Sequence, residues 1–119
     1  MATAAASISA DLRVLDQAHD RLQLSWADIG AIIGVDESTV HRWRSRTSTP
    51  RPMARTRVAQ LHETLDLLRR VFAGPDLARV WLTEKKPKGL GGADTPLDVM
   101  RAGRIDRVLM LLHFLARGA

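Results

Sequence analysis

Arginine is the residue type in this sequence that is best equipped for chemistry, and much of it is gathered in one segment. Fifteen of the 18 basic residues are arginine, Asp and Glu together number 13, and the formal net charge is +5. Guanidinium groups bind phosphates and the guanine edge through paired hydrogen bonds. The segment from Ser38 to His62 has no acidic residue and contains six arginines: Arg42, Arg44, Arg46, Arg51, Arg55 and Arg57. This segment favours a polyanionic partner, although arginines also coat solvated helix faces in proteins that bind no polyanion.

A helix-turn-helix is predicted at the start of this segment, over residues 26–45. Ile29 is followed by the small Gly30, and Gly34 can supply the tight turn between two short helices. In such motifs the second helix enters the major groove of DNA. We expect the outward-facing residues to contact base edges: Ser38, Thr39, His41 and Arg42. The predicted DNA-binding set also includes Arg44, Ser45, Arg46 and Arg51, whose arginines are suited to phosphates.

The elements that must position these residues are predicted to be helices, and the fold class is all-α. Apolar residues recur at helical spacing, and no alternating strand pattern is present. The predicted helices cover residues 11–22, 25–34, 36–46, 53–72, 76–82, 95–103 and 104–116. Ser25, Asp36 and Thr95 are the expected N-caps of three of them, and Ser9 or Asp11 would cap the first. Met1 to Ala10 is expected to be a tail that precedes the first helix.

The chain is predicted to have two parts. Residues 1–73 would hold the helix-turn-helix, and residues 74–119 would form a smaller helical domain after the Gly74-Pro75 break. The second part carries another group of arginines: Arg101, Arg104, Arg107 and Arg117. Cations at helix C-termini complement the helix dipole, and they also suit an acidic cleft of a protein partner. We expect at least one of the four to serve a partner.

No catalytic residue, metal site or cofactor is predicted. Cysteine is absent, which removes thiol nucleophiles and thiolate metal ligands. His62-Glu63 resembles half of a zinc-protease motif, but Asp66 stands where the second His belongs. The Lys85 to Gly92 loop lacks the Gly-Lys-Ser/Thr ending of a phosphate-binding loop. Binding is therefore the expected activity, and the lack of a long apolar run or a signal peptide favours the cytosol.

The C-terminal half resembles the toxin-binding domain of Xre/MbcA/ParS-type antitoxins. In that family the domain follows an Xre-like helix-turn-helix, which is the order found here. The residues that carry the resemblance are Ala78-Arg79-Val80-Trp81-Leu82, Pro87, Leu90-Gly91-Gly92, Thr95 to Met100, Gly103, Val108-Leu109, Leu112 and Gly118. Several of them, including Trp81, Leu82 and Leu97, are in the first place candidates for the core.

The resemblance implies a type II antitoxin whose partner is a RES-domain toxin that consumes NAD. It implies that the C-terminal region blocks the toxin's active-site cleft and that the complex represses its own promoter. It also implies a homodimer that forms larger complexes with the toxin. The expected toxin-binding residues are Trp81, Leu90, Arg101, Arg104, Arg107 and Arg117. A stand-alone helix-turn-helix regulator and an adaptor module with a solvated basic face remain as alternatives.

Overall fold

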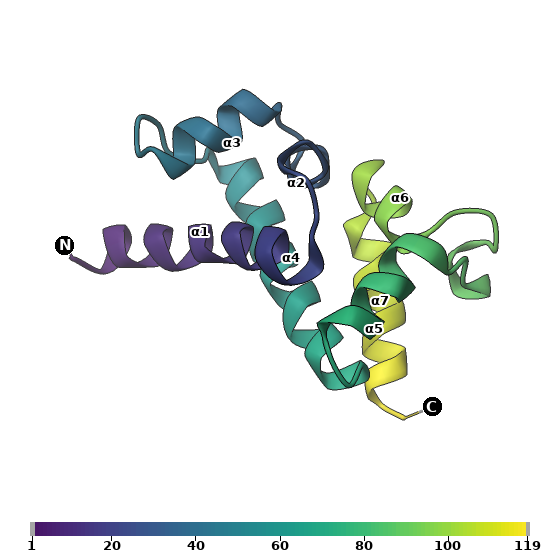
Figure 1. The fold of residues 1–119 in the computed structure, drawn as a ribbon. Coiled ribbons are helices and arrows are strands. Elements are labelled where there is room, and N and C mark those ends of the chain that lie inside the picture. Colours follow the sequence, from purple (N-terminus) through teal and green to yellow (C-terminus); the bar gives the residue numbers. More distant parts are fainter. Residues whose placement is uncertain (1, 119) are drawn as a thin grey trace.

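The fold is all-α, as the sequence predicts, and the computed structural model describes residues 2–118, with side chains from Leu12 onward. These residues form seven α-helices and one 3-10 turn, with no strand (Figure 1). The elements are α1 (Ala2–Leu22), α2 (Trp26–Ile33), α3 (Glu37–Arg44), α4 (Pro52–Val71), α5 (Pro75–Glu84), the 3-10 turn η1 (Lys88–Leu90), α6 (Pro96–Arg101) and α7 (Ile105–Ala116).

The start of the first helix was predicted wrongly. The sequence pattern puts it near Asp11, after a tail, whereas the backbone of α1 is helical from Ala2. Alanine has the highest intrinsic helix propensity, and the first residues are mostly alanine, so the helix extends backward past its amphipathic part. Ser9 and Asp11 consequently lie inside α1 and not at its N-cap. Met1 lies outside the described residues.

The three other predicted N-caps are confirmed. The Ser25 hydroxyl accepts a hydrogen bond from the Asp28 amide at 3.0 Å, and the Asp36 carboxylate accepts one from the Thr39 amide at 2.8 Å. The Thr95 hydroxyl accepts one from the Asp98 amide at 3.2 Å. Each bond satisfies an amide that has no partner inside its helix. The start of α2, α3 and α6 is therefore encoded locally.

Helix α4 lies at the centre of the molecule and contacts α1, α2, α5 and α7 (Figure 1). Its buried residues are Ala54, Val58, Leu61, Thr64, Leu65, Leu67 and Leu68. At 100° per residue they cover roughly half of the helix circumference, which is wider than the single stripe of the predicted pattern. Helical spacing in the sequence puts Phe72 on one stripe with Val58, Leu61, Leu65 and Leu68, but Phe72 is only half-buried. One continuous core results, and α7 closes it with Ile105, Val108, Leu109 and Leu112.

The turn of the helix-turn-helix depends on two glycines. Gly34 has φ +90°, and its amide donates to the Gly30 carbonyl at 2.8 Å. That left-handed conformation favours glycine and ends α2. A Cβ on Gly30 would lie 2.7 Å from the Val35 carbonyl oxygen, which is closer than real Cβ contacts allow. Gly30 therefore lets the chain of the turn fold back closely over α2.

Gly30→Ala is expected to destabilise the protein by about 1–3 kcal/mol, the usual cost of overpacking. Alanine is a better helix former than glycine by about 1 kcal/mol. Helix propensity alone would therefore raise the stability, so a loss of stability must come from the clash with the Val35 carbonyl. Urea unfolding followed by circular dichroism measures it. The matched control is Gly74→Ala, because Gly74 has an extended backbone and nothing lies within 4 Å of its added Cβ. Equal stability of the two variants would contradict the close approach at Gly30.

Candidate functional site

Trp26 joins the helix-turn-helix to the first helix. Its half-buried ring stacks on His19 of α1, with the ring centroids 4.1 Å apart. On α3, the Arg44 guanidinium carbon lies 4.0 Å from the centroid of the same ring. The His19 Nδ1–H also donates to the Leu24 carbonyl at 2.8 Å, which fixes the ring's orientation. One indole thus holds α1, α2 and α3 together and sets the angle at which α3 is presented.

The predicted base-contacting residues lie on or near the exposed side of α3, and an internal network orders several of them. The Asp36 carboxylate accepts hydrogen bonds from the hydroxyls of Ser38 and Thr39. The Arg42 guanidinium in turn donates to the Thr39 hydroxyl at 2.9 Å. Since the hydroxyl hydrogens of Ser38 and Thr39 are engaged by Asp36, these two residues can offer an incoming ligand only acceptor lone pairs. Arg42 remains the strongest exposed donor on α3.

His41 and Ser45 complete the exposed surface of α3. The His41 Nε2 atom lies 3.7 Å from the Glu37 carboxylate one turn earlier, and both side chains are about half exposed. The Ser45 hydroxyl donates to the Arg42 carbonyl at 3.2 Å, at the end of the helix.

Two arginines of the acid-free segment are committed to the protein itself. The Arg44 Nε atom donates to the Asp16 carboxylate at 3.1 Å, in addition to the stacking on Trp26. The half-buried Arg57 donates to the Gly103 carbonyl at 2.8 Å, at the break between α6 and α7. Packing therefore divides the predicted basic segment. Arg44 is still 40% exposed despite its ion pair, whereas Arg42, Arg46, Arg51 and Arg55 are exposed and have no ion pair among the described side chains.

Arg46 occupies a backbone conformation that normally requires glycine. Its φ is +64°, and its amide donates to the Trp43 carbonyl while the Thr47 amide donates to the Arg42 carbonyl. This pair of bonds is the Schellman ending of a helix, in which the left-handed residue is usually glycine. The left-handed conformation costs a residue with a Cβ about 1–2 kcal/mol. It explains why α3 ends at Arg44, two residues before its predicted end.

The predicted toxin-binding residues lie on several different elements of the fold and do not form one surface. Leu90 is 4% exposed and belongs to the core. Trp81 is half-buried against Phe72, with the ring centroids 5.4 Å apart. The Arg101 guanidinium lies 3.4 Å from the Asp28 carboxylate of α2. These three side chains have clear structural contacts in the described chain, whereas Arg104, Arg107 and Arg117 are exposed at or near α7.

Helix α7 exposes two large apolar residues that the sequence prediction missed. Met110 is 74% and Phe114 49% exposed. With Arg107 and Arg117 they follow one another at spacings of three and four residues, so the four lie on one face of α7. We call this set of four residues the α7 stripe. The only signal of this stripe in the sequence is that Met110 and Phe114 are apolar but do not fall on the face formed by positions 105, 108, 109 and 112.

This chain has relatives among known proteins. No protein-family model matches it. The mycobacterial cidal antitoxin MbcA of Mycobacterium tuberculosis and that of Mycobacterium bovis are each 31% identical to it over 101 residues, 85% of this chain and 87% of theirs. The chain belongs to the MbcA antitoxin family. The resemblance predicted from its C-terminal half is thereby confirmed at the level of MbcA, and the order of helix-turn-helix and C-terminal helices agrees with it.

A solved member of this family has the same fold. In the crystal structure of the M. tuberculosis MbcT–MbcA toxin–antitoxin complex, a chain with 28% identity matches with a TM-score of 0.68. The match covers 91% of this chain and 95% of that one. Because the coverage is nearly complete on both sides, the similarity includes α2–α3 as well as the C-terminal helices.

Neither a metal-binding cluster nor a membrane-spanning helix is present among the described residues. No group of three or more His, Cys, Asp or Glu side chains in this part of the chain is arranged to hold a metal ion. None of its helices is long and apolar enough to cross a membrane.

Asp36 should make the stability of α3 depend on pH. The hydrogen bonds from the Thr39 hydroxyl, the Thr39 amide and the Ser38 hydroxyl lower the pKa of the Asp36 carboxyl below its ordinary value of 3.8. A lowered folded-state pKa stabilises the fold fully above pH 3.8, and this contribution is lost as the pH falls through the folded-state value. Asp36→Asn keeps an acceptor but removes the charge. We expect the stability difference between wild type and Asp36→Asn to shrink below pH 3.8.

Thermal unfolding of both proteins between about pH 6 and about pH 2 measures this difference. Asp20→Asn is the matched control, because Asp20 is exposed and has no ion pair among the described side chains. A wild-type to Asp36→Asn difference that is the same at both ends of the range would refute the role of the charge.

Proposed function

We propose that this chain is a non-enzymatic antitoxin that binds and inhibits a RES-domain toxin that consumes NAD. The observation that carries the proposal is the similarity over nearly the whole chain to MbcA, an antitoxin solved together with a toxin. We further propose that it acts in the cytosol as a homodimer within a larger toxin–antitoxin complex. Its helix-turn-helix would bind the promoter DNA and repress the operon.

The α7 stripe is our candidate for the main toxin contact. Large apolar side chains flanked by arginines are the composition that protein interfaces favour, with aromatic, Met and Arg residues enriched. Phe114 and Met110 would enter an apolar pocket of the toxin, while Arg107 and Arg117 pair with its carboxylates. Arg104, at the N-cap of α7, extends the same positive charge. Trp81, Leu90 and Arg101 would contribute by holding α5, η1 and α6 in place beneath it.

DNA binding is proposed for the exposed end of α3. Arg42 would contact a base edge or phosphate, and Arg46 and Arg51 would contact phosphates beside it. The strained backbone of Arg46 supports this choice, since a glycine there would relieve the strain. In Figure 1, α3 and the C-terminus lie at opposite ends of the molecule, whose longest dimension is 42 Å. A toxin on α7 would therefore leave α3 accessible.

Phe114→Ala is expected to weaken toxin binding by at least about 30-fold, the effect of losing an aromatic hot spot. Co-purification and calorimetry with a co-expressed RES-domain toxin measure the affinity, and the rate of NAD consumption measures inhibition. The matched control is Met53→Ala, because Met53 is 80% exposed and lies at the start of α4, away from the C-terminal end of α7.

This experiment also separates the antitoxin from the alternative, a stand-alone regulator. Deleting the C-terminal helices cannot do so cleanly, because α7 completes the core of α4. If the wild-type chain neither binds the toxin nor slows NAD consumption, the antitoxin proposal fails and the regulator becomes the better explanation. Equal losses in Phe114→Ala and Met53→Ala would refute the α7 stripe alone.

Arg46→Gly is expected to change stability and DNA affinity in opposite directions. Removing the Cβ from a left-handed residue should stabilise the fold by about 0.5–1 kcal/mol. Losing a phosphate contact should weaken promoter binding and reduce the slope of log affinity against log salt by about 1. Arg42→Ala should weaken specific binding by about 5- to 100-fold.

Promoter binding at several salt concentrations, together with urea unfolding, gives both quantities. The control is Arg70→Ala, since Arg70 is exposed at the far end of α4 from α3. Unchanged DNA affinity in both Arg42→Ala and Arg46→Gly would show that α3 is not the DNA-binding element.

A further inference from the structure

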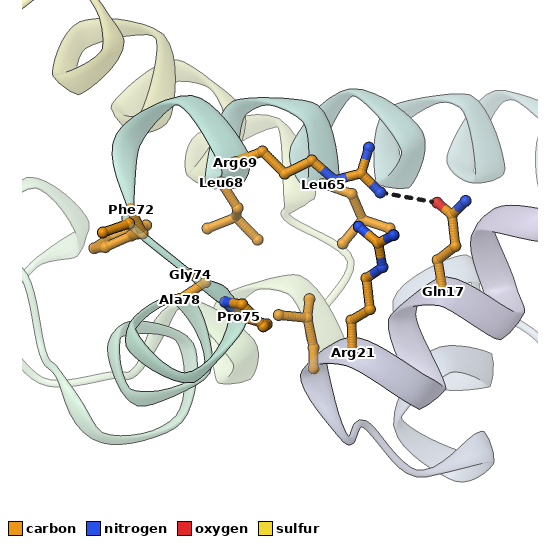
Figure 2. A pocket seen from close by; sticks show the side chains of 11 residues that line it. Gln17, Arg21, Leu65, Leu68, Arg69, Phe72, Gly74, Pro75 and Ala78 are labelled. Atoms are coloured by element: carbon orange, nitrogen blue, oxygen red, sulfur yellow. Dashed lines mark hydrogen bonds between the residues drawn. The ribbon is translucent and has the colours of Figure 1, made fainter.

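A cavity of about 370 Å³ opens between α1, α4 and α5 (Figure 2). Its apolar wall is built from Leu22 of α1, Leu65, Leu68 and Phe72 around the end of α4, and Ala78 of α5. Leu22, Leu65, Leu68 and Ala78 are buried, and Phe72 is half-buried. The cavity falls in the range of about 300–1,000 Å³ that is typical of small-molecule sites.

Two arginines stand at the opening of this cavity. Figure 2 shows Arg69 extending from α4 and Arg21 extending from α1, with their guanidinium groups near each other beside Leu65. The Arg69 guanidinium donates to the Gln17 amide oxygen at 3.4 Å and lies 3.7 Å from the Asp66 carboxylate. Arg21 has no ion pair among the described side chains. None of the eleven residues lining the cavity is acidic.

We propose that this cavity binds an amphipathic monocarboxylate, a medium-chain fatty acid. The alkyl chain would lie against Leu65, Leu68 and Phe72, and the carboxylate would accept charge-assisted hydrogen bonds from Arg21 and Arg69. A nucleotide fits this lining poorly, because a base and a sugar need several polar partners and Gln17 is the only neutral polar side chain in the wall. The inference is independent of the proposed antitoxin function, since none of these residues belongs to α3 or to the α7 stripe.

Calorimetric titration of the full chain with octanoate, decanoate and dodecanoate, below their micelle concentrations, tests the proposal. Each methylene buried should tighten binding about fourfold until the cavity is full. Decanol and decylamine have the same chain without the negative charge, and we expect both to bind at least about tenfold more weakly than decanoate. Absence of saturable decanoate binding at millimolar concentration, or equal binding of decylamine, would overturn the proposal.

Single substitutions then locate the carboxylate. Arg21→Gln and Arg69→Gln should each weaken decanoate binding by about 10- to 100-fold, the effect of losing a hydrogen bond from a charged donor. Arg70→Gln is the matched control, because Arg70 is exposed on the same helix and does not line the cavity. Circular dichroism of each variant checks that it is still folded. Affinities equal to that of Arg70→Gln, or tighter binding of a short peptide with an apolar C-terminal residue than of decanoate, would refute the assignment.

Discussion

The fold depends on the wide apolar surface of α4. Most surface helices bury one stripe, but α4 buries roughly half of its circumference, with Val58, Leu61 and Leu65 in the fully packed centre. On one side it receives α1 and α2, and on another it receives α7. The helix-turn-helix and the C-terminal helices are consequently anchored to the same element, and neither has a complete core without it.

The arginines are of two kinds in this fold: some bond to another element of the chain, and the others are exposed. Arg57 spans from α4 to the Gly103 carbonyl, Arg44 spans from α3 to Asp16, and Arg101 spans from α6 to Asp28. Each of these contacts ties together helices that are far apart in the sequence. Further exposed arginines lie at the end of α3 and along α7, and others lie on α1 and α4. Some arginines of this protein therefore join helices, and others are left exposed and available to a partner.

The two exposed surfaces also differ in character. At α3, hydrogen bonds along the chain Asp36, Thr39 and Arg42 order the polar side chains, and Arg46 holds a strained backbone. At α7 the exposed groups are mainly Met110 and Phe114, with arginines at both ends of the stripe. A polar, ordered surface suits a nucleic acid, and an apolar surface with charged flanks suits a protein. The proposed function, with DNA bound at α3 and a toxin bound at α7, would use one of each.

Local sequence is enough to predict the helical class, the caps at Ser25, Asp36 and Thr95, and the turn at Gly34, because these depend on residues within one turn of each other. It also carried the family resemblance. Tertiary structure alone decided that Leu90 is buried, that Arg44 and Arg101 are paired within the chain, and that Met110 and Phe114 are exposed. Periodicity shows that a helix has an apolar face, but not how many neighbours cover it. Pairing between residues such as Asp16 and Arg44 depends on how helices pack, which no local pattern encodes.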